Sequence, residues 1–147
     1  MTKVFVDNDE ELRHYRFMPA KTPTEAELAI LQVLWNTGPA TVREILHVLQ
    51  ASKPTGYTTA LKMLQIMTEK GLVERDHTVR PQIYRPKYSR EHTQKRMLSD
   101  LLDRAFGGSV KTLVLQALSS KKSTPAELAQ IEKVLDRLDE RRKGDSK

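Results

Sequence analysis

The segment GYTTALKMLQIMTEKGLVER, residues 56–75, carries the strongest structural signals in the sequence. It begins with small hydroxylated residues, continues as an amphipathic run, and ends in a glycine followed by two apolar residues. On a helical wheel its apolar side chains fall within about 100° of one another, as a core-facing stripe does: Ala60, Met63, Leu64 and Met67. The stretch therefore predicts a helix that ends at Gly71 and leads directly into a strand.

The opposite face of this helix is polar over its N-terminal half. It carries Thr58, Leu61, Lys62, Gln65 and Glu69, so its only acid comes last. A helix that enters a DNA major groove by its N-terminus needs this arrangement, because hydroxyls and amides bond base edges and methyl groups contact thymine. Two alternatives stay open: Thr58 and Thr59 could only cap and start the helix, and Leu61 could only cover the edge of the core.

A β-hairpin is predicted after the helix, in LVERDHTVRPQIYRPKY, residues 72–88. Apolar and polar residues alternate, with Leu72-Val73 and Ile83-Tyr84 facing inward and a turn near residues 78–81. The hairpin carries basic side chains suited to DNA phosphates beside the groove: Arg75, His77, Arg80 and Arg85.

Two shorter helices are predicted before residues 56–75. In TPTEAELAILQVLW, residues 22–35, Thr22 can cap the helix, Pro23 suits its first position and Glu25 completes a capping box. Its apolar face is Leu28, Leu31, Leu34 and Trp35, and that of the next helix is Val42, Ile45, Leu46 and Leu49. Three helices and a hairpin in this order predict a mainly α fold, a winged helix-turn-helix over residues 22–88.

Three further amphipathic helices are predicted over residues 89–147. Residues 1–21 show no sustained hydrophobic period and are predicted to form a flexible N-terminal arm. The apolar residues at helical spacing in the C-terminal region are Leu98, Leu101, Leu102, Phe106, Leu113, Val114, Leu128, Ile131, Leu135 and Leu138. These helices cannot fully cover one another's apolar faces, which predicts a dimerisation region that pairs with a second copy.

Charge is concentrated in the middle of the chain. Of a net charge of +6, residues 41–96 contribute 11 Lys/Arg against 5 Asp/Glu, while the other residues carry 14 of each sign. A basic middle on an otherwise neutral chain favours local contact with a polyanion, and the alternative is a solvated charged face.

Several classes of protein are excluded by composition. The chain has no cysteine, which rules out disulfides, zinc–thiolate sites and thiol catalysis and favours a cytoplasmic setting. No stretch approaches the roughly 18 to 20 apolar residues of a membrane span. The four histidines lack ligand spacing, and neither a nucleophile with a base nor a phosphate-binding glycine loop is visible, so we expect no metal, no cofactor and no enzyme.

Three motifs resemble the penicillinase-repressor family of bacterial transcription regulators, which includes beta-lactamase and methicillin-resistance repressors and copper-responsive relatives. They are TEAELAILQVLW, YTTALKMLQIMTEKGLV and FGGSVKTLVLQAL, in family order and spacing, within a resemblance that covers residues 23 to about 138. The resemblance implies a homodimer that binds a palindromic double-stranded DNA operator. The copper-responsive members bind metal through C-terminal cysteines, which this chain lacks.

The resemblance also implies roles for particular residues. By position, Thr58, Thr59 and Lys62 fall on the recognition helix, and Arg80 and Arg85 in or beside the wing. In antibiotic-responsive members a membrane-anchored sensor protease is associated with repressor cleavage at an Asn-Phe bond, which aligns here with Gln116-Ala117.

The sequence thus predicts a DNA-binding transcription repressor. The expected DNA-binding residues are Thr58, Thr59, Leu61, Lys62, Gln65, Arg43, Arg80 and Arg85. The alternative is a winged-helix module whose basic face binds an acidic protein or RNA; an exposed apolar patch on the helix of residues 56–70 would favour it, and Leu61 with Ile66 is the hint of one.

Overall fold

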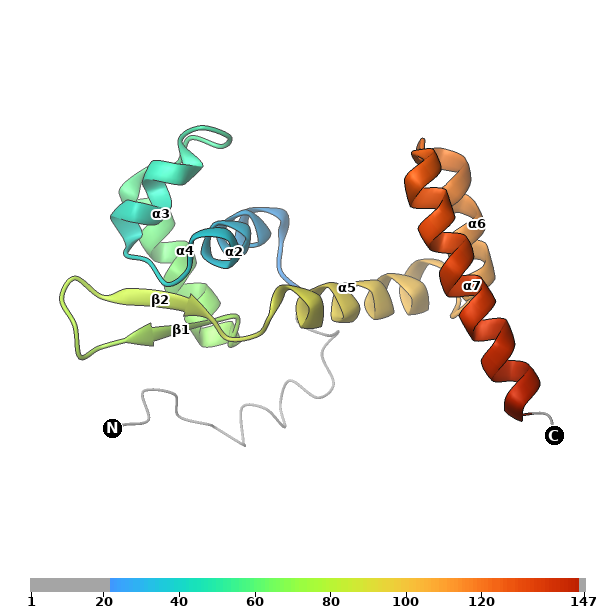
Figure 1. The fold of residues 1–147 in the computed structure, drawn as a ribbon. Coiled ribbons are helices and arrows are strands. Elements are labelled where there is room, and N and C mark those ends of the chain that lie inside the picture. The colour runs from blue at the N-terminus through green and yellow to red at the C-terminus, as the bar shows by residue number, and fades with distance from the viewer. Residues whose placement is uncertain (1–21, 146–147) are drawn as a thin grey trace. The chain divides into compact units, whose positions relative to one another are not determined.

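The computed structural model describes residues 22–145 (Figure 1). The expected arm of residues 1–21 lies outside them. Packing divides the described residues into two compact units, with the boundary between residues 101 and 102. The expected domain boundary between residues 88 and 89 stays a prediction.

The first two helices of the winged helix begin with capping boxes. Helix α2 (Glu25–Thr37) follows Thr24, whose hydroxyl accepts the Glu27 N–H at 3.2 Å while the Glu27 carboxylate accepts the Thr24 N–H at 2.9 Å. Helix α3 (Val42–Leu49) starts in the same way, with Thr41 and Glu44. The prediction that Thr22 caps the first helix was therefore wrong: the capping pattern fits both threonines, and the chain uses the second.

Helix α4 (Tyr57–Lys70) is the helix that the sequence predicted within residues 56–75. It ends at Gly71, whose φ of 78° lies in the left-handed region that glycine adopts without strain. Ala60, Leu64 and Met67 are fully buried, and Met63 packs against them partly exposed. The structure thus confirms the predicted core stripe.

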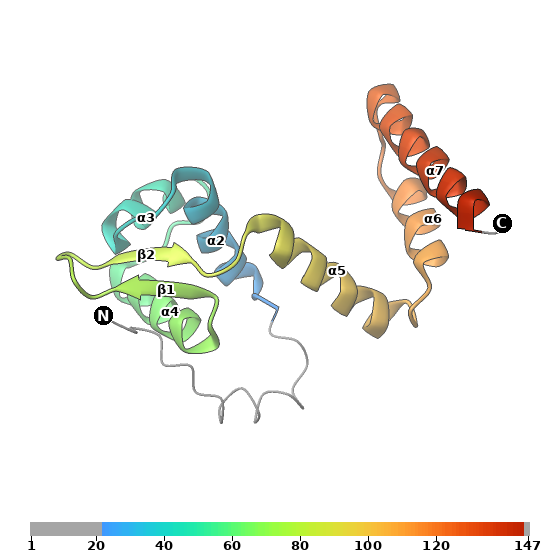
Figure 2. The same cartoon turned by 60° about the horizontal axis from the view of Figure 1, so that its bottom comes forward.

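The wing is a two-stranded antiparallel hairpin of β1 (Val73–Asp76) and β2 (Ile83–Pro86). Ala40, between α2 and α3, adds a bridge to β2: its N–H donates to the Tyr84 carbonyl at 3.0 Å and its carbonyl accepts the Tyr84 N–H at 2.8 Å. The closed end of the hairpin projects past the helices in both views (Figures 1 and 2).

One hydrophobic core holds the three helices and the hairpin together. Its buried members are Ile30, Leu31, Val33, Leu34, Ala40, Val42, Ile45, Leu49, Ala60, Leu64, Met67, Leu72, Val73 and Tyr84. The apolar face of α2 differs from the expected one, since Ile30 and Val33 are buried whereas Leu28 and Trp35 are half-buried. The inward-facing residues expected of the hairpin are buried, apart from Ile83, which is half-buried.

Helix α5 (Arg90–Ala105) starts against the winged helix and crosses the boundary between the units. The Trp35 indole N–H donates to the Tyr88 carbonyl at 3.1 Å, and the Arg90 guanidinium lies 5.7 Å from the centre of the Trp35 ring. Gly107 and Gly108, both with positive φ, follow the helix as the sequence predicted.

Helices α6 (Val110–Ser120) and α7 (Pro125–Asp145) bury no residue. Most of their large apolar side chains are exposed, as are two on α5: Leu98, Leu101, Val110, Val114, Leu115, Leu118, Leu128, Val134, Leu135 and Leu138. Leu102, Phe106, Leu113 and Ile131 are half-buried. Over residues 22–145, no helix is long and apolar enough to cross a membrane.

Candidate nucleic-acid interface

The exposed face of α4 is polar where the sequence placed it. Thr58, Lys62 and Gln65 are exposed on the side opposite the buried stripe. Leu61 is half-buried against the core, at the flank of this face. The exposed face therefore offers a hydroxyl, an ammonium and an amide to a partner, the side-chain types that bond base edges and phosphates.

Thr59 lies on a different flank of α4 from Leu61. Thr59 lines a cavity between α4 and α2, whereas Leu61 lines a groove between α4, α3 and the wing. The structure thus brings Thr58, Lys62 and Gln65 together on one face, with Thr59 and Leu61 at its two edges.

The groove beside Leu61 has a volume of about 250 Å³. Its lining residues come from the starts of α3 and α4 and from the wing: Thr41, Val42, Arg43, Tyr57, Leu61, Pro81, Gln82 and Tyr84. The Arg43 guanidinium lies 5.5 Å from the centre of the Tyr57 ring, a cation–π distance. Arg43 is thereby held at the N-terminal end of α4.

The wing carries one exposed arginine in its loop, Arg80. The first turn of this loop is set by Asp76, whose carboxylate accepts the Thr78 hydroxyl at 2.6 Å and the Thr78 N–H at 2.8 Å. These bonds from the Thr78 hydroxyl and N–H hold the pKa of Asp76 below its usual value. A fixed turn limits the positions that the loop can adopt.

Two other arginines of the hairpin have partners within it. Arg85 Nε lies 2.8 Å from Glu74 Oε2, across the strand pair. Arg75 lies with its Nη2 3.4 Å from His77 Nε2. The sequence analysis gave Arg80 and Arg85 the same expected role. Their surroundings differ, because the Glu74 carboxylate pairs with Arg85.

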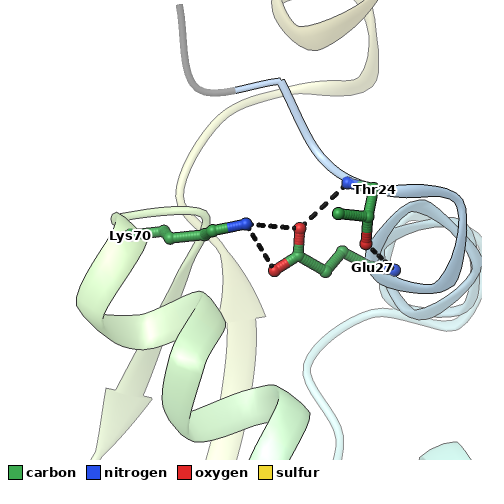
Figure 3. Close-up of polar contacts among 3 residues, drawn as sticks. All are labelled: Thr24, Glu27 and Lys70. Carbon is green, nitrogen blue, oxygen red and sulfur yellow. Dashed lines mark hydrogen bonds and ion pairs between the residues drawn. The ribbon is translucent and has the colours of Figure 1, made fainter. Parts of the chain in front are cut away.

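The far end of α4 is fixed by a carboxylate from α2. Lys70 Nζ lies 2.9 Å from Glu27 Oε1 and 3.1 Å from Oε2, and the same carboxylate accepts the Thr24 N–H (Figure 3). Burial raises the pKa of Glu27, but the Thr24 hydrogen bond and the Lys70 ammonium outweigh it, so the pKa lies below its usual value. The ion pair helps to set the position of α4 against α2.

Sequence reasoning missed Tyr57 and Gln82 as residues of this surface. Tyr57, the first residue of α4, is 47% exposed and lies beside Arg43. Its position next to Thr58 and Thr59 could have indicated that it belongs to this surface. Gln82 reaches the groove only through the hairpin turn, which spacing along the chain does not predict.

Within the described part of the chain, no three His, Cys, Asp or Glu side chains are placed to hold a metal ion.

Three helices, a hairpin wing and an exposed polar face on the third helix define a winged helix-turn-helix protein. The penicillinase repressor family matches residues 23–137, so the chain belongs to this family of transcriptional regulators, which are not enzymes.

Two relatives are similar to this chain, both named transcriptional regulator BlaI and both from Mycobacterium tuberculosis, strains CDC 1551 / Oshkosh and ATCC 25618 / H37Rv. Each is 32% identical over 82 residues, which cover 55% of this chain and 59% of the relative. The match thus spans less than two thirds of these relatives.

Proposed function

We propose that this chain is a cytoplasmic transcription repressor that binds a palindromic DNA operator as a homodimer. The observation that carries the proposal is the exposed polar face of α4, with Thr58, Lys62 and Gln65, on the winged helix of a penicillinase repressor family member. A helix with a buried stripe on one side and short polar side chains on the other can enter a major groove without unfolding.

Different side chains have different tasks in this proposal. Thr58 and Gln65 contact base edges and specify sequence, while Lys62 contacts phosphate. Thr59 and Leu61, at the edges of the face, add contacts to a phosphate and a thymine methyl. Arg43 beside Tyr57 and Arg80 in the wing loop contact the backbone on either side of the groove.

The dimer is proposed from the uncovered apolar side chains of the C-terminal helices. Leu128, Leu135 and Leu138 recur on α7 and are 45%, 55% and 54% exposed. Exposed apolar side chains in such a row are stabilised when a second helix covers them. Leu98, Leu101, Leu102, Phe106, Leu113, Val114 and Ile131 complete the proposed contact surface, and a symmetric pair of winged helices matches a palindromic operator.

Release from DNA is proposed to act through the same region. The Gln116-Ala117 bond lies within α6, and both residues are exposed. Cleavage there by a membrane-anchored sensor protease, or a rearrangement of the helices, would separate the two winged helices without altering α4.

Selection of bound sites from a random DNA pool tests the proposal. We expect a palindromic site with two equal half-sites. The alternative function, a module that binds an acidic protein or RNA, has one observation in its favour: Ile66 is 39% exposed on α4. Recovery of no enriched DNA sequence would favour that alternative.

A further inference from the structure

A cavity of about 320 Å³ lies between α2, the loop that follows α3, and the start of α4. Its volume falls at the lower end of the range for small-ligand sites, about 300 to 1,000 Å³. It shares no lining residue with the groove beside the wing. Its apolar lining residues are Ala26, Ala29, Ile30, Leu49, Pro54 and Met63.

The rest of the lining is polar and comes from the loop and the first turn of α4: Lys53, Thr55, Gly56 and Thr59. Two hydrogen bonds order the loop, from the Gln50 amide to the Thr55 carbonyl at 2.8 Å and from the Thr55 hydroxyl to the Lys53 carbonyl at 2.9 Å. Among residues 22–145 the Lys53 ammonium has no carboxylate partner within ion-pair distance. The polar side of the cavity is therefore positive.

The start of α4 adds to this positive side. Gly56 gives the helix no side-chain cap, in contrast to Thr24 of α2 and Thr41 of α3. A Cβ at position 56 would meet nothing within 4 Å, so packing does not require glycine there. The positive end of the α4 dipole thus lies beside the cavity together with Lys53.

From this apolar cavity with a positive side we propose a binding site for a small carboxylate with an apolar body, such as an aromatic acid. The body contacts Ala29, Ile30 and Met63, and the carboxylate contacts Lys53 and the first turn of α4. The negative charge of the ligand complements the positive side of the cavity. The site should therefore bind such a carboxylate more tightly than a neutral molecule of the same shape.

Occupancy of the cavity is expected to affect DNA binding, and this second part rests on the proposed function. A bound carboxylate neutralises Lys53 and the positive end of α4, next to Thr58. Both positive groups would otherwise attract DNA phosphates. The ligand and the operator therefore weaken each other's binding, by the same factor.

The site is tested by NMR titration of the full ¹⁵N-labelled chain with sodium benzoate, at constant ionic strength and without DNA. We expect saturable shifts at the cavity residues with a dissociation constant of about 1 mM, in keeping with the small size of the probe. Benzamide, the neutral analogue, should bind about 10-fold more weakly because it lacks the charge-assisted bonds.

Two variants and a control accompany the titration. Lys53→Gln should weaken benzoate about 10-fold and leave benzamide unchanged, whereas Ala29→Leu should abolish both by filling the cavity. Lys122→Gln, an exposed lysine between α6 and α7, should change nothing. If Ala29→Leu fails to fold, the Lys53→Gln variant still tests whether the carboxylate binds in the cavity. Shifts that do not saturate, equal binding of benzoate and benzamide, or an unaffected Lys53→Gln variant would overturn the site.

Operator affinity, measured with and without saturating benzoate, tests the second part. We expect the affinity of the wild-type chain to fall several-fold and that of Lys53→Gln to change less. An unchanged affinity would overturn the link to DNA while leaving the site intact. Absence of operator binding before benzoate is added would instead contradict the proposed function.

Discussion

The ammonium of Lys70, at the end of α4, lies 2.9 Å from the Glu27 carboxylate, at the start of α2 (Figure 3). The Glu27 side chain is 6% exposed and that of Lys70 33%. Because Glu27 also accepts the Thr24 N–H, one carboxylate both caps α2 and fixes the end of the proposed recognition helix. This contact links the start of the winged helix to the position of the proposed DNA-binding face.

Replacing Glu27 by Gln should therefore destabilise the winged helix. We expect a loss of about 1 to 3 kcal/mol in the free energy of unfolding at pH 7, because the amide carries no charge to pair with the Lys70 ammonium and has only one acceptor oxygen for Lys70 and Thr24. Urea unfolding followed by Trp35 fluorescence measures it, since Trp35 is the one tryptophan of the chain and packs against the core. Glu69→Gln, an exposed carboxylate of α4, is the matched control and should change little.

The Glu27 contribution should also depend on pH. The pKa of Glu27 is lowered in the folded chain, so its stabilisation is present above the unfolded-state pKa near 4.5 and is lost as the pH falls through the folded value. The difference between wild type and Glu27→Gln should thus be full at pH 7 and shrink at pH 3. A difference that stays constant between these pH values would show that the charge of Glu27 is not what stabilises the fold.

Thr58→Ala and Lys62→Ala should weaken operator binding without unfolding the protein, because both side chains are exposed opposite the core. A lost base contact costs about 1 to 3 kcal/mol and relaxes sequence preference, which we expect for Thr58. A lost phosphate contact weakens all sequences alike, which we expect for Lys62. Affinities for the selected operator and single-base variants measure both effects, and unchanged binding in both variants would mean that another face of α4 meets the DNA.

Arg80 and Arg85 should differ in their effect on DNA binding. Arg80→Ala should weaken binding to all sequences and reduce the salt slope by about 1, as loss of one phosphate contact does. Arg85→Ala should have a smaller effect, because Arg85 is paired with Glu74 at 2.8 Å. Salt titrations of the two variants provide the comparison. If Arg85→Ala had the larger effect, the ion pair would have to open on the DNA.

The fold was predictable from the sequence where local signals act alone. The stripe of Ala60, Leu64 and Met67 and the stop at Gly71 predicted α4, and alternation predicted the hairpin. The start of α2 could not be predicted in this way, because Thr22 and Thr24 both stand three residues before a glutamate. In the structure Glu27 both completes the capping box with Thr24 and pairs with Lys70. Because Lys70 lies 43 residues away, the pattern of neighbouring residues could not predict this ion pair.

The candidate interface was predictable only in part. Periodicity identified the exposed side of α4, with Thr58, Lys62 and Gln65, because a buried stripe defines its own opposite face. The pairing of Arg85 with Glu74 depends on strand register, and the placement of Thr59 on the α2 side depends on how α4 packs. Those contacts are set by tertiary structure and not by spacing along the chain.

A chain cut after Leu101, at the unit boundary, should remain folded but should no longer bind the operator at concentrations at which the full chain binds it. All buried core residues lie between Ile30 and Tyr84, so the winged helix keeps its core. Loss of the second, tethered half-site should cost about 100-fold to 10,000-fold in affinity. Size in solution and operator affinity of the full and cut chains test this. A cut chain that still dimerises, or binds as tightly, would place the dimer contacts elsewhere.

Sequence-specific binding is tested by measuring affinity for the selected palindromic duplex and for a scrambled duplex of equal length and composition, across a range of salt concentrations. If each subunit neutralises about three to four phosphates, log K for the operator should fall with log salt at a slope of about −5 to −7. At each salt concentration the palindrome should bind much more tightly than the scrambled duplex. Equal affinities for the two duplexes, however tight, would contradict a sequence-specific repressor.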